Sequence, residues 1–413
     1  MKTCGLDVHK DTIFCAIYDG KDAVVEKFST FTPDIEAMCD YIQAQGLDTV
    51  AMESTGIYIR VICTVMRQRG MRPVVVNPFL IKQMPGRKSD VADSVWIAKL
   101  LYNGMISDSF IPDGVLAKLR VYTRQYCRMV QRRSSALTLV DQQLVGMGIR
   151  LSSCLSKITT KSFMRVAKAV AGGETDPAAL EKLVHGCLKH KRDGTLRKAL
   201  TGCAGEQDLW RLRKLLEIVD MYEAQIAEAE KHMEELAEAN YREEMAHIRT
   251  IPGISRISAM CIIAEIGADM SLFGSAQRIV GWACLRPRND ESAGKYKSTA
   301  VVKGGKHLKP MLIQAAWGAV HASGSQFGAF FGRVSARRGA KKAIVAVARK
   351  LLVTIYAILR DGSEYSPLHS KTEATAAYIH KMAVLDAQRH RRLERMAAAQ
   401  GIVLSELTDK LNL

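Results

Sequence analysis

The chain has 413 residues, which is long enough for two or three domains. Of these residues 48% are hydrophobic and 24% charged, a composition that excludes a largely disordered protein. Its formal net charge of +17 favours a polyanionic partner, because lysine and arginine side chains that neutralise phosphates release condensed counterions. Ten scattered cysteines, with no Cys-x-x-Cys pair, argue against a disulfide scaffold or a zinc finger and indicate a reducing, cytoplasmic location.

The chain begins with a short apolar run over residues 3–10 that predicts a buried strand with an acid, Asp7, inside it. A second apolar run follows at 12–17, and tight turns are predicted near 10–11 and at 19–22. Because a carboxylate in a core strand is costly unless it is paired or bound to a cation, Asp7 is the first candidate functional residue.

Helices and strands then alternate. We predict a helix after Pro33, a strand at 50–53, a helix at 58–69, a strand at 72–77 and a helix at 90–102, whose N-cap is Ser89. Three antiparallel strands followed by this alternation is the order of an α/β RNase H-like (RuvC-like) domain, which we place at residues 1–110.

A long helical arm is predicted for residues 111–248. It starts with a helix over 115–150 whose polar positions are mostly basic. Further along, apolar residues from Leu212 to Leu236 recur at alternating spacings of four and three, a heptad pattern. Two interpretations of this seam stay open: a coiled coil, or a hairpin with the 115–150 helix of the same chain.

A mostly α-helical C-terminal domain is predicted at 249–365, followed by a charged helical tail at 366–413. The turn at 251–254, with its Pro-Gly pair, is typical of loops that present backbone N–H groups to a phosphate. The apolar stretch 343–359 contains Arg349 and Lys350, so it predicts a packed helix and no membrane span.

Four acids form the candidate metal site. Asp7, Glu53, Asp90 and Asp93 come from three elements that an RNase H-like topology brings together, and the last two share a helix face. Hard carboxylate oxygens suit Mg²⁺, and two such ions roughly 4 Å apart can stabilise the entering and leaving oxygens of a phosphodiester. In the structural alternative, Asp90 and Asp93 stabilise the helix by interacting with the positive end of its dipole, and Glu53 forms an ion pair with Arg60.

A candidate nucleophile lies in the polar, glycine-rich segment 286–295. Ser292 could attack a phosphate and give a covalent phosphoserine link, which conserves the bond energy for rejoining. Loop serines more often bond the backbone, and Ser298 and Thr299 are rivals on spacing alone. Cations are interspersed with glycines here and at 302–309, and we predict that nucleic acid contacts Lys88, Arg124, Arg128, Arg132, Gly253, Arg286, Arg288, Lys295, Lys303 and Lys306.

The chain resembles the IS110-family transposases over most of residues 3–365. The resemblance rests on six motifs in the family's order: Gly5-Leu6-Asp7-Val8-His9-Lys10, Met52-Glu53-Ser54-Thr55-Gly56, Lys88-Ser89-Asp90-Val91-Ala92-Asp93, Ile251-Pro252-Gly253-Ile254, Glu291-Ser292-Ala293-Gly294-Lys295 and Lys303-Gly304-Gly305-Lys306. The fifth motif departs from the family's usual Ser-Ser-Gly-Gly-Lys and keeps only the second serine position, that of Ser292.

This resemblance implies a RuvC-like DEDD domain that binds Mg²⁺ through the four acids, and a second transposase domain in which Ser292 is the attacking residue. It also implies a homo-oligomer, a dimer or tetramer, whose protomers build a composite site. A structured noncoding RNA from the element would pair with donor and target DNA.

The sequence therefore predicts a DNA transposase, a site-specific recombinase that moves its own insertion element. One alternative is a Holliday-junction-type metal-dependent endonuclease in which Ser292 is only structural. Another is a non-catalytic RNA- or DNA-binding protein whose acids are structural.

Overall fold

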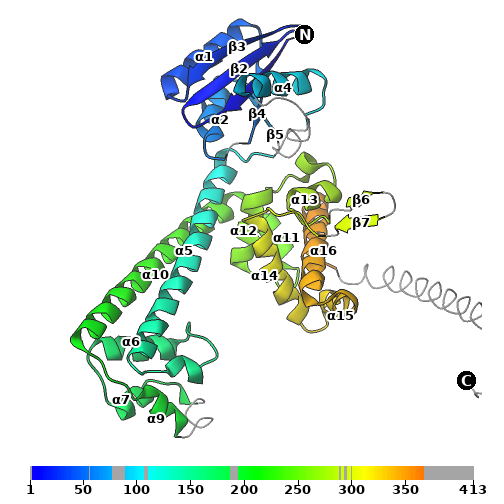
Figure 1. Cartoon of the computed structure of the whole chain (residues 1–413). Helices are drawn as coiled ribbons and strands as arrows, with labels where there is room; N and C mark the ends of the chain where they lie inside the picture. Colours follow the sequence, from blue (N-terminus) through cyan, green and yellow to red (C-terminus); the bar gives the residue numbers. More distant parts are fainter. Residues whose placement is uncertain are drawn as a thin grey trace, which may run out of the picture. The chain divides into compact units, whose positions relative to one another are not determined.

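The protein is described by a computed structural model of the whole chain (Figure 1), which defines residues 2–54, 56–76, 89–106, 110–186, 194–287, 290–292, 295–298 and 300–366. At 290–292 and 295–297 it defines the backbone. The chain forms two compact units, Met1–Pro112 and Asp113–Leu413. The predicted arm and the predicted C-terminal domain both belong to the second unit.

The first unit is built on a five-stranded mixed sheet with the strand order β3-β2-β1-β4-β5. The first three strands pair antiparallel, and the last two continue the sheet parallel to β1. Their bounds are β1 Thr3–Val8, β2 Thr12–Tyr18, β3 Ala23–Ser29, β4 Thr49–Glu53 and β5 Arg72–Val76. This topology confirms the prediction of an α/β RNase H-like domain.

Both faces of β1 are covered, so all six of its residues are buried. Cys4, Leu6 and Val8 join one core beneath α1 (Thr32–Ala44) and α2 (Ile59–Gln68). Because strand side chains alternate, Thr3, Gly5 and Asp7 face the other way, toward α4 (Asp90–Tyr102). The hydroxyl of Thr3 donates to the carbonyl of Ala98 on that helix at 2.9 Å.

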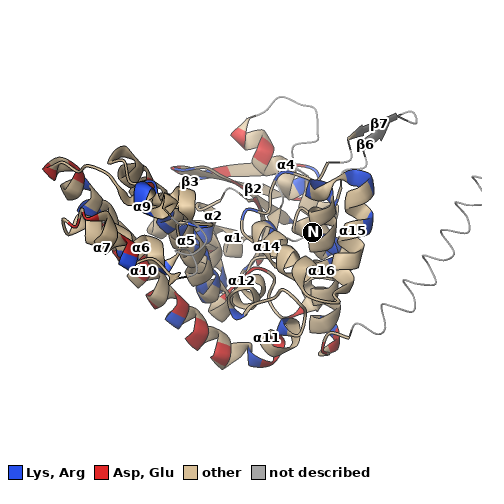
Figure 2. Cartoon of the chain, turned by 90° about the horizontal axis from the view of Figure 1, so that it is seen from below, with Lys and Arg blue, Asp and Glu red and all other residues tan. Residues whose placement is uncertain are grey.

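The second unit starts with an antiparallel helix pair, α5 (Gly114–Gly146) and α10 (Glu206–Asn240), visible side by side in Figure 1. At one end the rings of Tyr122 and His232 stack at 4.9 Å, and at the other the amide of Gln143 donates to Asp208 at 3.0 Å. The heptad seam of α10 therefore packs on α5 of the same chain, which is the hairpin interpretation. Figure 2 shows acidic and basic positions along the ribbon of α10.

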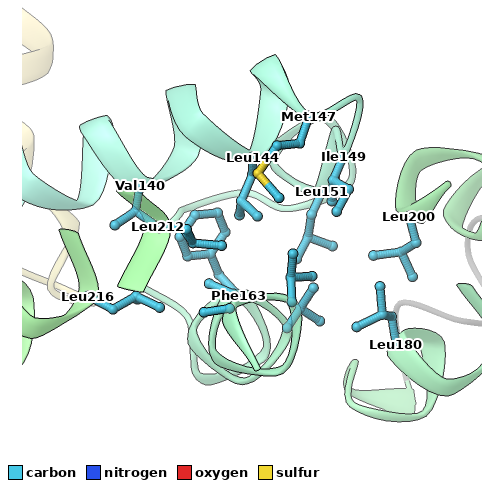
Figure 3. Packing of buried hydrophobic residues seen from close by; sticks show 14 of the residues in the cluster. Val140, Leu144, Met147, Ile149, Leu151, Phe163, Leu180, Leu200, Leu212 and Leu216 are labelled. Carbon is cyan, nitrogen blue, oxygen red and sulfur yellow. The ribbon is translucent and has the colours of Figure 1, made fainter. Parts of the chain in front are cut away.

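Between the two long helices the chain folds into a small tip with its own core. Its elements are η1 (Leu151–Cys154), α6 (Lys161–Ala171), α7 (Pro177–Lys182) and α9 (Thr195–Leu200). Phe163 is fully buried among leucines of both long helices, including Leu144 and Leu212 (Figure 3). The tip thus closes the end of the hairpin with apolar packing.

The rest of the second unit is a helical bundle that carries one short hairpin, β6 (Asp290–Ser292) and β7 (Lys295–Ser298). Its helices are α11 Arg242–Arg249, α12 Arg256–Ile266, η2 Met270–Phe273, α13 Ala276–Trp282, α14 Leu308–His321, α15 Gln326–Arg338 and α16 Ala340–Asp361. The predicted packed helix at 343–359 lies in α16, which contacts α14 and α15. In the described part of the chain, no helix combines the length and the apolarity needed to cross a bilayer.

Candidate active site

The acids of the first unit gather where α4 begins, and a glycine determines how close that helix lies. A Cβ atom on Gly5 would lie 2.4 Å from the backbone N of Ala98 and 2.5 Å from the carbonyl O of Ser94. Only glycine therefore allows α4 to rest directly on β1. Ser89 begins this helix as predicted, since its hydroxyl accepts from the N–H of Ala92. Asp90 and Asp93 are thereby placed in the first helical turn.

Asp7 lies under that turn, two residues after Gly5 on the same face of β1, and is 6% exposed. The ring atom Nε2 of His9 lies 3.0 Å from Oδ2 of Asp7 and 3.4 Å from Oδ1 of Asp90. Burial raises the pKa of Asp7; His9 opposes this shift, whereas the nearby charges of Asp93 and Asp90 reinforce it. The electrostatics of the site therefore disfavour a bare carboxylate at Asp7 and favour a bound cation.

Glu53 ends the neighbouring parallel strand. The register pairs Gly5 with Ala51 and Leu6 with Met52, so the next position sets Asp7 beside Glu53 at the carboxyl edge of the sheet. Glu53 is half-buried there. All four predicted acids thus belong to one edge of the first unit, at the ends of β1 and β4 and in the first turn of α4.

This donor set fits a divalent metal ion. One ligand atom each from Asp7, His9 and Asp90 lies within 4.8 Å of the other two, the spacing of donors around a single ion. Three further features favour a cation: hard oxygen donors, a carboxylate with a raised pKa, and an exposed approach past Asp90.

His9 was not among the predicted site residues. It follows β1 directly and lies two residues beyond Asp7, and the period of a strand would have placed both side chains on one face. An imidazole next to a buried carboxylate is also a common structural pair. Only the second contact, to Asp90, ties His9 to the acid cluster.

The predicted nucleophile belongs to the second unit. Ser292 ends β6 and pairs with Lys295 across the hairpin, so it lies directly before the turn. The side chains of Ser292 and Lys295 lie outside the described residues, as do Lys88, Arg288 and Thr299 altogether. Of the rivals, Ser298 accepts a hydrogen bond from the backbone N–H of Ala300 at 3.2 Å, the ordinary role of a loop serine.

Four of the predicted nucleic-acid contacts line one cavity of about 730 Å³, which we call the basic cavity. Its walls come from α5, from residues 253–258 and from residues 306–315. The four are Arg124, Arg128, Gly253 and Lys306. None of the described residues lining it is acidic. Of the remaining predicted contacts with described side chains, Arg132, Arg286 and Lys303 are exposed outside it.

Within that cavity Arg124 already has a protein partner that the sequence did not reveal. Its guanidinium donates two hydrogen bonds, at 2.7 and 2.9 Å, to the carboxylate of Glu265, which is 5% exposed on α12. Arg120 donates to the carbonyls of Ala264 and Glu265 beside it. The charge of Arg124 is thus largely used to balance a buried acid. Arg128 is exposed and makes no ion pair with another described residue.

The glycines of the predicted phosphate loops are explained by protein contacts. Gly253 has φ +87°, and a Cβ there would lie 2.2 Å from the backbone N of Ala319 on α14. A Cβ on Gly305 would lie 2.8 Å from the carbonyl O of Ala283. Both glycines therefore allow close packing within the protein, and the predicted contact of Gly253 with phosphate stays a prediction.

Comparison with known proteins agrees with both halves of this arrangement. Residues 4–149 match the DEDD transposase model of the IS110 type, and residues 245–332 match the model described as the transposase IS116/IS110/IS902 family. Together the two matches take in more than half of the chain. The chain belongs to the IS110 family of transposases.

The IS110-family match at 4–149 contains all four acids, and the match at 245–332 contains Ser292, Lys306 and Trp317. Over 131 residues the chain is 31% identical to the pilin gene-inverting protein of Moraxella lacunata and 30% identical to that of Moraxella bovis. Each of these alignments takes in 31% of this chain and 40% of the relative. This IS110-family chain therefore spans about two fifths of the length of those curated relatives.

Proposed function

We propose that the protein is a DNA transposase, a site-specific recombinase that cleaves and rejoins the strands at the ends of its own insertion element. The observation that carries the proposal is the acidic edge, where Asp7 lies buried beneath the first turn of α4 within reach of His9 and Asp90. Membership of the transposase family and the basic cavity of the second unit support it.

Asp7, Glu53, Asp90 and Asp93 would hold Mg²⁺, which supplies stabilisation of the charge that develops on the phosphodiester oxygens when bound. The chain's own contribution is to orient the carboxylate oxygens that would bind the ion. The ring of His9 holds the buried carboxylate of Asp7 in one direction. The Gly5 contact fixes the helix that carries the other two aspartates.

Ser292 would be the nucleophile. Its Oγ would lose a proton and form a bond to phosphorus while the bridging P–O bond of the strand breaks, and that proton would pass to the released strand end, which becomes a free hydroxyl. The hydroxyl of a second strand would then attack the phosphoserine, restoring the serine and one intact phosphodiester. Arg286, Arg288 and Lys295 would balance the charge on the transferring phosphate.

The partners in this proposal are donor DNA, target DNA and a noncoding guide RNA, with a homo-oligomer as the active form. The net charge of +17 supports polyanionic partners, and a basic cavity lined by Arg128 and Lys306 is suited to phosphate contacts. Base pairing by the RNA would supply sequence specificity, which phosphate contacts alone do not.

The test is a recombination assay on plasmids that carry the element ends, followed by a denaturing gel. We expect wild-type protein with Mg²⁺ to give recombinant product and protein covalently attached to a DNA end. Asp7→Asn, Ser292→Ala and addition of a chelator should each reduce product by at least about a hundredfold, because each removes a group needed for the chemical step. Retention of nucleic-acid binding by both variants is the control for folding.

Two results would redirect the assignment. Metal-dependent strand cleavage without attached protein, and with Ser292→Ala fully active, would indicate a water-using endonuclease of the Holliday-junction type. Binding of nucleic acid with no cleavage product under any metal condition would indicate a non-catalytic binding protein.

A further inference from the structure

We propose that α14 carries a binding site for an unpaired nucleotide, with the base stacked on Trp317 and its neighbouring phosphates held by Arg128 and Lys306. This inference rests on the proposed function as a nucleic-acid enzyme and names the form of nucleic acid that one site takes. The ligand class is a single-stranded segment, of DNA or of RNA.

Two cavities meet at the first turns of α14. The basic cavity lies on one side, and a second cavity of about 550 Å³, which we call the tryptophan cavity, lies on the other. Lys306, Pro310 and Gln314 line both of them. A ligand that follows this helix turn would therefore touch both cavities at once. One cavity is basic and the other largely apolar, just as a nucleotide has a charged phosphate and an apolar base face.

The basic cavity suits phosphate. Arg128 and Lys306 are exposed cations on its wall, and no described lining residue is acidic. Burial lowers the pKa of His307 in the same wall, and the charges of Arg124, Arg120 and Arg128 lower it further, with Glu265 opposing them. The balance of these charges is positive, which favours an anion.

The tryptophan cavity suits a base. Apart from its lysines and Gln314, its walls are Ile313, Pro310, the two glycines 304–305 and Trp317, whose surface is 39% exposed. The indole is fixed by contact with the rings of Phe331, at 5.4 Å between centroids, and His321, at 5.9 Å. A large aromatic ring that is held by two neighbouring rings and lines an open cavity is suited to stacking with bases.

The loop that borders the tryptophan cavity is also fixed in place. The ammonium of Lys309 donates to the carbonyl of Val302 at 3.3 Å, which ties the loop 302–305 to α14. The loop also packs closely against Ala283, whose carbonyl O would lie 2.8 Å from a Cβ on Gly305. The cavity is therefore pre-formed, which lowers the entropy lost on binding.

Stacking on Trp317 requires a base with a free face. In a duplex both faces of every base are covered by neighbouring pairs, whereas single strands stack readily on aromatic side chains. A site with cationic side chains for phosphate and an aromatic ring for the base therefore distinguishes an unpaired segment from a duplex. The duplex would contact the cationic side chains alone.

The first experiment uses the wild-type chain. Fluorescently labelled oligo(dT), oligo(U) and a duplex of equal length are titrated with protein across a series of salt concentrations. We expect at least one single strand to bind more tightly than the duplex. A strand carrying photoreactive 5-bromouracil should, after irradiation, give a crosslinked peptide from residues 304–321.

The second experiment compares variants. Trp317→Ala should weaken single-strand binding by about tenfold or more while duplex binding changes little, and Trp317→Phe should recover most of the affinity because it keeps a ring. Trp210→Ala is the matched control, because Trp210 is exposed on α10 and lines neither cavity. Arg128→Gln should weaken every nucleic acid and reduce the salt dependence by about one released counterion.

The outcomes separate the two proposals. If wild-type protein binds nucleic acid but Trp317→Ala binds single strands normally, or crosslinks map away from α14, this inference is wrong and the transposase proposal stands. If the folded wild-type chain binds none of the three probes, the proposed function itself fails. Preference for oligo(dT) or oligo(U) identifies the unpaired segment as DNA or RNA.

Discussion

In the metal-free protein, two effects act together to disfavour the charged form of Asp7. It is buried, and its neighbours include two further acids that raise its pKa together with the desolvation. A carboxylate whose pKa is raised on folding favours the native state below its unfolded pKa, and this contribution is lost as the pH rises through the folded value. A bound metal ion would offset the free-energy cost of the buried negative charge of Asp7 at neutral pH.

We therefore expect Asp7→Asn to raise the melting temperature in chelator at neutral pH, since it removes a buried charge, and to lose this advantage at acidic pH. Adding Mg²⁺ should raise the melting temperature of wild-type protein and leave that of Asp7→Asn nearly unchanged. Thermal unfolding followed by fluorescence measures both. Asp11→Asn, in an exposed turn of the same unit, is the control. Equal Mg²⁺ shifts in wild type and Asp7→Asn would remove Asp7 from the metal site.

Arg124 and Arg128 are one helical turn apart on α5, yet their surroundings predict opposite behaviour. Arg124→Gln removes two hydrogen bonds from the buried Glu265 and leaves it the more distant Arg120, at 3.6 Å, which should reduce the free energy of unfolding by about 2 kcal/mol. Arg128→Gln should change it by less than about 0.5 kcal/mol because Arg128 is exposed. Denaturant unfolding provides both values. A loss of nucleic-acid affinity should follow the reverse order, so equal losses in the folded variants would contradict this division of roles.

At the scale of elements, the position of α4 depends on a single missing side chain. Gly5→Ala would force the helix away from β1, because the added Cβ meets backbone atoms that cannot rotate aside. We expect a loss of about 1–3 kcal/mol in stability and a larger loss of activity, since Asp90 and Asp93 would move with the helix. Gly146→Ala is the control, because nothing lies within 4 Å of a Cβ there. Unchanged activity in Gly5→Ala would show that the first turn of α4 does not position catalytic groups.

Local signals in the sequence were sufficient for most elements of the first unit. The N-cap Ser89 marked the start of the predicted helix 90–102, and α4 has the same bounds. The long helix predicted over 115–150 ends earlier, at Gly146, and Gly148 follows it with φ +85°. Glycine in that conformation terminates helices, and the pattern of apolar residues continues past the point where the backbone turns.

Contacts between distant elements could not be read in the same way. A heptad seam indicates that an apolar partner helix exists but does not identify it. Only the structure shows that α10 pairs with α5 of its own chain. Glu265 lies more than a hundred residues from Arg124, and nothing local marks the two as partners. The predicted contact of Gly253 with phosphate stays a prediction; the sequence indicated that this glycine provides space, but did not reveal that α14 packs against it.

At the scale of the whole molecule, the acids belong to one compact unit and Ser292 to the other. The proposed recombinase could join them within a protomer or between protomers, and mixing variants distinguishes the two. If the site is shared between protomers, a mixture of Asp7→Asn and Ser292→Ala should recover part of the recombination, because one pairing restores an intact site. If the site forms within one protomer, every site in the mixture lacks one group and activity stays at background. Gel filtration of the mixture checks that the variants associate.

The antiparallel helices α5 and α10 also set a length. Each residue of an α-helix advances about 1.5 Å, so seven residues added to both helices at matched positions would extend the hairpin by roughly 10 Å and rotate its end only slightly. Five residues, at about 100° each, would instead leave it turned by roughly 140°. Because the end is closed by its own buried leucines around Phe163, it would travel as an intact piece. The pair of helices α5 and α10 is therefore a spacer of defined length, which insertions can change while the acidic edge and the two cavities stay as they are.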